Sequence, residues 1–211
     1  MTRILPGVLA MAAVVVASNI LVQFLILDGL LTWGAFTYPL AFLVTDVMNR
    51  VYGAGPARRV VFIGFMVGIV CSLIGSQIMI QGDGYEFPAV AIRVAIGSAT
   101  AFLIAQLIDV AIFQRLRDGA WWKAPLASTL IGSTIDTALF FTIAFSGLLS
   151  FGATADGEIS WAQDTVPFLL SGPDAPLWVT LAVADWGVKL AVALVALVPF
   201  RLIVGRMQRT A

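Results

Sequence analysis

The chain has 211 residues, of which 60% are hydrophobic and only 11% are charged, and its 12 basic and 12 acidic residues give a formal net charge of zero. The mean hydropathy is +0.99, whereas about a quarter of the residues of an ordinary soluble domain are charged. Nothing in this composition suggests nucleic-acid binding, and we expect no nucleic-acid partner. The chain has no histidine and a single cysteine, Cys71, which excludes an intrachain disulfide and a site of clustered histidines and cysteines.

The apolar residues form long runs of about 20 residues, the length that crosses ~30 Å of hydrocarbon as an α-helix. A membrane barrel would instead show short segments of alternating hydrophobicity. The sequence therefore predicts an all-α integral membrane protein, a six-transmembrane-helix bundle in a single domain over residues 1–211. In chain order, the predicted spans are about 5–27, 32–50, 60–81, 88–116, 124–149 and 175–202.

Glycine and proline punctuate these spans. Gly53, Gly55 and Pro56 are expected to break the backbone between the second and third spans. Pro88 is expected in the first turn of the fourth span, where a helix does not need its amide proton. The long connection 150–174 is apolar enough to fold over the outer face of the bundle.

Positive charges alternate between the predicted loops. The first, third and fifth loops hold no lysine or arginine, whereas the N-terminus, the second and fourth loops and the C-terminus hold Arg3, Arg50, Arg58, Arg59, Arg115, Arg117, Lys123, Arg201, Arg206 and Arg209. Because basic loops stay on the cytoplasmic side, both termini are predicted to be cytoplasmic.

Acidic residues interrupt four of the apolar spans, at Asp46, Asp109, Asp136 and Asp185. An intramembrane carboxylate costs ~2.5–3.5 kcal/mol on insertion scales and usually faces a bundle interior or a water-filled path. Lys189 lies four residues after Asp185, so the two can pair along one helix. Asp136 and Lys189 both lie ~18 Å from the inner ends of their spans. A polar interior of this kind indicates transport.

Residues three or four apart share a helix face, which places Gln106, Asp109 and Phe113 in one stripe and Asp136 beside Phe140 in another. Carboxylates and amides match the hydrogen-bonding edge of a guanine-type base, and phenylalanine rings can stack on its face. This set suits a flat, polar heterocycle. Asn19 and Gln23 share a face of the first span, where interhelical packing at ~0.6 kcal/mol for each hydrogen bond is the simpler interpretation.

The stretch 37–53, TYPLAFLVTDVMNRVYG, resembles the signature of the queuosine-precursor transporters of the vitamin-uptake class, through Thr45-Asp46, Asn49 and Tyr52-Gly53. Later segments agree in order and spacing: Ala105 to Asp109 (AQLID) with Phe113, Ile135-Asp136-Thr137 with Phe140, and Lys189 in the last span. The sequence departs from this pattern at Arg50, where many members of the family carry an acid.

The resemblance implies a bacterial inner-membrane, multi-pass importer of 7-deazaguanine bases in the cyano or aminomethyl form, the precursors of the tRNA nucleoside queuosine. It also implies a fold similar to the substrate-binding subunits of energy-coupling-factor transporters. The residues it implies for substrate binding and translocation are Asp46, Asn49, Gln106, Asp109, Phe113, Asp136, Phe140 and Lys189. A second set comprises Asn19, Gln23, Thr45, Tyr52, Arg93 and Asp185.

Other interpretations stay open from sequence. The chain could be a membrane subunit that binds another vitamin or a purine-like solute and is energised by partner ATPases, or a structural membrane protein whose acids only fix helix packing. An intramembrane enzyme is disfavoured, because the motifs of a membrane aspartyl protease are missing and no P-loop is present. We expect no cofactor and no metal. The expected partners are a flat heterocycle and membrane lipid, with a homodimer and a separate energising partner left open.

Overall fold

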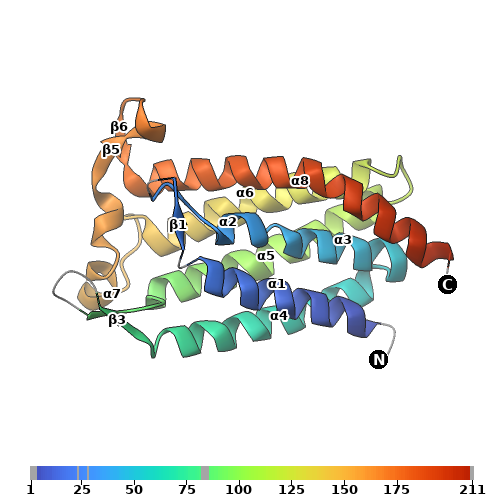
Figure 1. Ribbon diagram of the computed structural model, residues 1–211, viewed down its shortest axis with the longest axis horizontal. Helices are drawn as coiled ribbons and strands as arrows, with labels where there is room; N and C mark the ends of the chain where they lie inside the picture. The colour runs from blue at the N-terminus through green and yellow to red at the C-terminus, as the bar shows by residue number, and fades with distance from the viewer. Residues whose placement is uncertain (1–3, 23, 28, 82–85, 210–211) are drawn as a thin grey trace.

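The long helices of the protein lie side by side along one common direction in the computed structural model, which describes residues 4–22, 24–27, 29–81 and 86–209 (Figure 1). In chain order these helices are α1 (Leu5–Leu21), α3 (Leu40–Tyr52), α4 (Ala54–Gly75), α5 (Ile92–Leu116), α6 (Lys123–Phe145) and α8 (Leu177–Arg209). Both ends of the chain lie at one end of this bundle, and the short strands lie toward the other (Figure 1).

Four helices within the described part of the chain, α4, α5, α6 and α8, are long and apolar enough to cross a membrane, and α1 is a shorter apolar helix. Large apolar side chains are exposed on the outer faces of these helices, among them Leu9, Met66, Leu73, Leu194 and Val195. Such a surface favours lipid over water as its surroundings. The chain is therefore an all-α membrane protein.

The first helix is shorter than the predicted span. α1 ends at Leu21, and β1 (Leu25–Ile26) then pairs antiparallel with β2 (Leu31–Thr32). The chain can reverse here because Gly29 adopts a positive φ of 88°, a conformation that costs glycine nothing. The predicted span therefore ran past the end of the helix into β1, the first strand of a short hairpin.

The second span is not one helix. A short helix, α2 (Gly34–Thr37), precedes α3, and Tyr38 and Pro39 separate them. Pro39 has no amide proton with which to continue the helical ladder. α3 ends at Gly53, whose φ of 87° few other residues would tolerate.

The expected breaks at Gly55 and Pro56 were wrong. Both residues lie in the first turn of α4, where the amide groups have no partner within the helix, so a proline there removes no hydrogen bond. The turn between α3 and α4 therefore depends on Gly53 alone, and α4 begins well before the predicted boundary at residue 60.

The connection between α4 and α5 contains a second hairpin. β3 (Met79–Gln81) pairs antiparallel with β4 (Glu86–Pro88). Pro88 therefore ends a strand and does not begin a helix, contrary to expectation, and α5 begins at Ile92 after the extended residue Ala91.

The long connection between α6 and α8 is folded. It contains α7 (Ala153–Gly157), two 3-10 turns, η2 (Ser160–Gln163) and η3 (Phe168–Leu170), and the paired strands β5 (Thr165–Pro167) and β6 (Asp174–Pro176). Ile159 and Ala162 pack against Phe141, Ala144 and Phe145 at the end of α6. This connection covers the bundle end that lies opposite both termini (Figure 1).

Close helix packing places the interior groups. A Cβ added to Gly132 of α6 would lie 2.7 Å from a ring carbon of Phe42 and 3.4 Å from Cβ of Asp109, so α6 approaches α3 and α5 closely at this point. α3 also contacts α1, α4 and α8. Because α3 lies between so many neighbours, its polar residues face protein and not lipid.

The last helix is the longest. α8 extends to Arg209, past the predicted end at residue 202, and contains Pro199, which removes one hydrogen bond of the helical ladder. At 1.5 Å per residue α8 spans about 50 Å, more than the hydrocarbon core, and its final turns slope away from the direction of the rest of the helix (Figure 1).

Candidate functional site

Lys189 of α8 is the centre of a buried ionic group. Its Nζ lies 2.7 Å from Oδ2 of Asp136 on α6 and 2.6 Å from Oδ2 of Asp185 one turn earlier on α8. The Lys189 and Asp136 side chains are 4% and 3% exposed, and the Asp185 side chain is 15% exposed. The predicted pairing of Asp185 with Lys189 is therefore confirmed, and Asp136 joins it from a second helix.

Neutral groups complete this site. The Thr137 hydroxyl accepts a hydrogen bond from Lys189 at 3.0 Å and lies 3.0 Å from Oδ2 of Asp185. The Tyr38 hydroxyl donates to Oδ1 of Asp136 at 3.4 Å, and the Lys189 ammonium lies 5.6 Å from the centre of the Tyr38 ring. One cation and two carboxylates thus meet an aromatic ring, a set able to exchange hydrogen bonds with a flat heterocycle.

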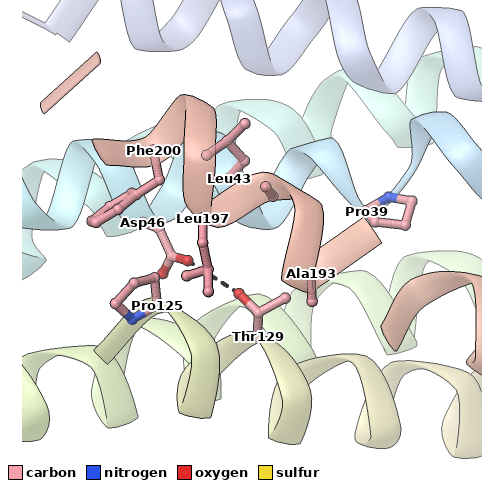
Figure 2. A pocket seen from close by; sticks show the side chains of 9 residues that line it. Pro39, Leu43, Asp46, Pro125, Thr129, Ala193, Leu197 and Phe200 are labelled. Atoms are coloured by element: carbon pink, nitrogen blue, oxygen red, sulfur yellow. Dashed lines mark hydrogen bonds between the residues drawn. The ribbon is translucent and has the colours of Figure 1, made fainter. Parts of the chain in front are cut away.

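A second polar group lies nearer the end of the bundle that holds the termini. Asp46 of α3 is 2% exposed and accepts hydrogen bonds from the Ser128 and Thr129 hydroxyls of α6, both at 3.1 Å. Figure 2 shows Asp46 and Thr129 facing each other beside Leu197 and Phe200 of α8. Ser128 precedes Asp136 by eight residues, about 12 Å along α6, so the two groups lie at different depths.

Asp109 of α5 belongs to this second group. It is fully buried, interacts electrostatically with Asp46 and lies beside the same Ser128 hydroxyl. Neither of its carboxyl oxygens has a hydrogen-bond partner among the described residues.

Two amides flank the acids. Asn49 donates from Nδ2 to the Val110 carbonyl at 3.0 Å, while its Oδ1 is unpartnered within the described part of the chain. Oε1 of Gln106 lies 2.6 Å from the Thr45 hydroxyl, and Nε2 of Gln106 likewise finds no described partner. Because buried polar groups are normally satisfied, these free atoms mark a place where a solute, a water or a proton would be accommodated.

The two phenylalanines lie in different surroundings. Phe113 is fully buried toward the end of the bundle that holds the termini, 6.2 Å from the Phe200 ring, and the Arg50 guanidinium lies 5.1 Å from its ring centre. Phe140 is partly exposed, one turn beyond Asp136, and packs against Phe141. The Phe113 ring is therefore already in contact with Arg50 and Phe200, whereas Phe140 lies one helical turn from Asp136 of the Lys189 group.

Arg93 does not join either group. It is 1% exposed near the N-terminal end of α5, donates to the Ile143 and Ser146 carbonyls at the end of α6, and forms an ion pair with Asp156 of α7 at 2.8 Å. The Ser150 hydroxyl, the Phe151 amide and the Arg93 guanidinium hold the pKa of the Asp156 carboxyl below its usual value. Arg93 thus joins the connection between α6 and α8 to the bundle.

The remaining predicted residues lie apart. Asn19 donates to the Val15 carbonyl of its own helix at 2.8 Å, and Tyr52 packs on the apolar cluster between α1, α3, α4 and α5. Gln23 lies outside the described residues.

Sequence reasoning missed four groups that complete the sites: Tyr38, Ser128, Thr129 and Thr137. A signal for three of them exists, because Ser128, Thr129, Gly132, Ser133, Asp136 and Thr137 recur every three or four residues and form one buried face of α6. This spacing is that of a polar stripe along an otherwise apolar span, and it identifies the face of α6 that carries the site.

The interior is closed in this conformation. A cavity of about 10 Å³ beside Asp46, lined also by Leu43, Thr129 and Ala193 (Figure 2), has room for about one water molecule. Ligand pockets are usually about 300–1,000 Å³. Binding of a heterocycle would therefore require the helices to separate.

Comparison with known proteins follows this geometry. A family model described as putative vitamin uptake transporter matches residues 32–204. The queuosine precursor transporter of Escherichia coli (strain K12) is 34% identical over 198 residues, 88% of this chain and 79% of that protein. The probable queuosine precursor transporter of Haemophilus influenzae is 33% identical over 175 residues, 80% of this chain and 66% of that protein.

A more distant relative, the probable queuosine precursor transporter of Bacillus subtilis (strain 168), is 26% identical over 180 residues, 79% of this chain and 68% of that protein. No solved structure matches the chain. The family match begins before α2, ends at residue 204 within α8, and includes every residue of the two polar groups. The chain therefore belongs to the vitamin uptake transporter family, together with these queuosine precursor transporters.

Proposed function

We propose that the protein imports queuosine precursors, 7-deazaguanine bases in the cyano or aminomethyl form, across a bacterial inner membrane. The observation that carries this proposal is the similarity to the Escherichia coli queuosine precursor transporter over most of both chains. A closed membrane bundle with an ionic group buried in its interior supports it. The transported base is the substrate, and the chain acts as a carrier without chemistry of its own.

The proposed topology has six spans in the single domain 1–211, with both termini in the cytoplasm. Support comes from the distribution of charge between the bundle ends. The basic residues at the ends of α3, α5 and α8 and at the starts of α4 and α6 share the end that holds the termini, and the acidic residues Glu86, Asp156, Glu158, Asp164 and Asp174 lie in the opposite connections. Basic residues favour the cytoplasmic side.

The base would bind at the Lys189 group. The ring carbonyl of a deazaguanine accepts one hydrogen bond from the Lys189 ammonium, and the adjacent ring N–H and amino group donate to the Asp136 carboxylate. In the closed state Lys189 and Asp136 satisfy each other at 2.7 Å. Substrate would therefore replace protein contacts, which keeps the charged groups paired throughout the cycle.

The other predicted residues take places along the same path. Phe140, one turn from Asp136, is positioned to stack on the bound base. Asp46, Asn49, Gln106 and Asp109 would line the inner half of the path. Phe113 would form its inner end, where release requires the Arg50 side chain to move from the ring.

A second function remains a candidate, because the matching family is described by vitamin uptake. In that case the chain would be the substrate-binding membrane subunit of a complex energised by partner ATPases. Purification in mild detergent from its native host distinguishes the two: a stoichiometric ATPase partner supports the subunit, and a homogeneous solitary carrier supports the first proposal.

The test is the queuosine content of tRNA in a bacterial strain that lacks both precursor synthesis and its own importer. The protein is expressed in this strain and each base is supplied at low concentration. Restored queuosine supports import and ranks the two precursors. Absence of queuosine, with the protein confirmed in the membrane, contradicts the proposal.

The same assay tests the site. Asp136→Asn should reduce queuosine at least tenfold at limiting precursor, because an amide cannot accept two parallel N–H groups. Asp164→Asn makes the same chemical change at an exposed position in the outer connection and should leave uptake unchanged. Equal uptake by both variants would reject the assignment of Asp136.

A further inference from the structure

The Asp46 and Asp109 carboxyl groups form a buried acidic pair without a countercharge. They lie on α3 and α5, are 2% and 0% exposed, and interact with each other beside the Ser128 hydroxyl. Lys189 forms its ion pairs with Asp136 and Asp185, and Arg93 forms its ion pair with Asp156. Two adjacent carboxylates cannot both remain ionised in a dry interior without a cation.

The unpartnered atoms concentrate here. Both Asp109 oxygens, Oδ1 of Asn49 and Nε2 of Gln106 lack described partners, and each of these side chains is fully buried. Asn49 follows Asp46 by one turn of α3, and Gln106 precedes Asp109 by one turn of α5. Every one of these atoms belongs to the acidic pair or to a residue one helical turn from it. Because buried polar groups are normally hydrogen-bonded, this concentration of unpartnered atoms indicates a binding site.

The charged groups on the surrounding helices lie elsewhere. On α3, the Arg50 guanidinium feels the Asp46 charge, but it donates to the Arg117 carbonyl at 2.5 Å and lies over the Phe113 ring. The basic residues of α4, α5 and α6 are at the inner ends of these helices, at Arg58, Arg59, Arg115 and Lys123.

The wall contributed by α8 is apolar. Ala193, Ala196, Leu197 and Phe200 line the cavity at Asp46, and Lys189 of the same helix is already paired with Asp136 and Asp185. Among the described residues, no ion pair joins Asp46 or Asp109 to a cation in this conformation.

We propose that Asp46 and Asp109 form a proton-binding site, distinct from the substrate site at Lys189, through which inward proton movement drives base uptake. This inference rests on the proposed function. The proton enters from outside and forms an O–H bond on one carboxyl group, which donates to the other. It leaves to the cytoplasm when the inner end opens, so one proton crosses for each base and no bond of the base changes.

A proton fits the site without any movement of the helices. The cavity that reaches Asp46 and Thr129 is about 10 Å³, room for about one water molecule. A proton adds no volume. That water-sized space also gives the carboxyl group a route for proton exchange when the bundle opens.

The bound proton can be observed without transport. Infrared spectroscopy of the purified protein at neutral pH should show the C=O stretch of a protonated carboxyl group, and that band should be absent from Asp109→Asn. Asp164→Asn, the exposed control, should retain the band. A wild-type protein without this band at neutral pH overturns the inference, whatever the protein transports.

Coupling is then measured in proteoliposomes with the membrane potential clamped. An inside-alkaline gradient of one pH unit should raise accumulation of the base about tenfold over its external concentration, the equivalent of 1.4 kcal/mol. A pH dye inside the vesicles should report acidification on addition of the base. Asp109→Asn should lose both the accumulation driven by the pH gradient and the acidification, whereas Asp164→Asn, the exposed control, should keep both.

These measurements distinguish failure of proton coupling from failure of the proposed import function. Exchange of base without an effect of the pH gradient overturns proton coupling and leaves the importer intact. Accumulation that follows a sodium gradient at constant pH also overturns it. Lack of base binding contradicts the proposed function, and the infrared band then decides the proton site alone.

Discussion

At the scale of single residues, Lys189 balances two carboxylates in a place where hydrocarbon surrounds the bundle. One positive charge meets two negative ones, so the group keeps a net negative charge that a hydrogen-bond donor from substrate would relieve. Its members depend on each other: removal of one buried partner leaves the others without compensation. The two sides of the group should therefore respond differently to substitution.

We expect Lys189→Met to destabilise the fold by roughly 3–5 kcal/mol, because two buried carboxylates would lose their cation. Asp136→Asn should cost far less, since Lys189 keeps its ion pair with Asp185 at 2.6 Å. Thermal unfolding in detergent measures the loss of stability of each variant, and the queuosine content of tRNA measures uptake. A stable Lys189→Met protein would show that the group is not an interdependent ionic unit in the membrane.

Arg93 is a residue whose role the structure redefines. The sequence placed Arg93 among the candidate residues of the translocation path. Its guanidinium instead donates hydrogen bonds to the Ile143 and Ser146 carbonyls and forms an ion pair with Asp156. Arginine supplies several donors in a fixed plane, which suits the free carbonyls at the end of α6. Its contribution is therefore to the fold of the outer connection.

Arg93→Met should leave those carbonyls unsatisfied at about 1–3 kcal/mol each and release α7 from the bundle. Amide hydrogen exchange in residues 153–157 should become faster, while exchange in the middle of α5 stays slow. Arg59→Met, at an exposed position in α4, is the control. Unchanged protection of α7 in Arg93→Met would contradict the anchoring role.

At the scale of elements, the pairing of α7 with the bundle should depend on pH through Asp156. The pKa of this carboxyl is lowered in the folded protein, so its stabilisation is present above the unfolded value of about 3.9 and is lost as the pH falls through the folded value.

Protection factors of α7, corrected for the intrinsic exchange rate, should be constant between about pH 5 and 8 and fall in stronger acid. Asp156→Asn should remove this dependence. An α7 whose protection changes near neutral pH would point to a different titrating group.

The α5–α6 pair depends on small residues at its contact. A Cβ added to Gly97 would lie 3.1 Å from Cβ of Ala144 and 3.2 Å from its amide nitrogen, so the two backbones approach closely. Gly97→Leu should separate the helices and lower the apparent melting temperature by roughly 5–10 °C. Gly187→Leu in α8, where nothing lies within 4 Å of an added Cβ, should change it little.

Hydropathy predicted most of the helices but few of their ends. Runs of apolar residues identify α4, α5, α6 and α8 because lipid requires them. The apolar strands β1 and β3 directly continue the apolar runs of α1 and α4, so hydropathy extended the predicted spans to residues 27 and 81, past the ends of these helices. Their separation depends on backbone geometry at positions such as Gly29, which composition does not reveal.

The candidate site was predicted where spacing along one helix decides the contact. Asp185 and Lys189 pair as expected because four residues make one turn. The contacts of Lys189 with Asp136 and of Asp46 with Ser128 join different helices. These contacts depend on how each helix is rotated about its axis. A span that faces both lipid and protein is apolar on all sides, so its sequence shows little periodicity from which that rotation could be predicted.

At the scale of the whole molecule, the two polar groups lie at different depths of one closed bundle. The Lys189 group is near the middle of α8, and the Asp46–Asp109 pair is nearer the end of the bundle that holds both termini. An alternating carrier needs its substrate accessible from one side at a time, and a closed interior is the state between the two. Orientation then decides which group meets the cytoplasm first on opening.

Orientation is tested by labelling from outside. In a Cys71→Ser background, cysteines are introduced singly by Asp174→Cys in β6 and Asp118→Cys after α5, both at exposed positions. Spheroplasts are treated with a membrane-impermeant maleimide. We expect label on the Asp174→Cys variant alone, and on both after the membrane is opened, because positive charges hold the Asp118 end in the cytoplasm. Label on Asp118→Cys in sealed spheroplasts would invert the bundle, and the Asp46–Asp109 pair would then lie toward the outside, at the entrance of the path.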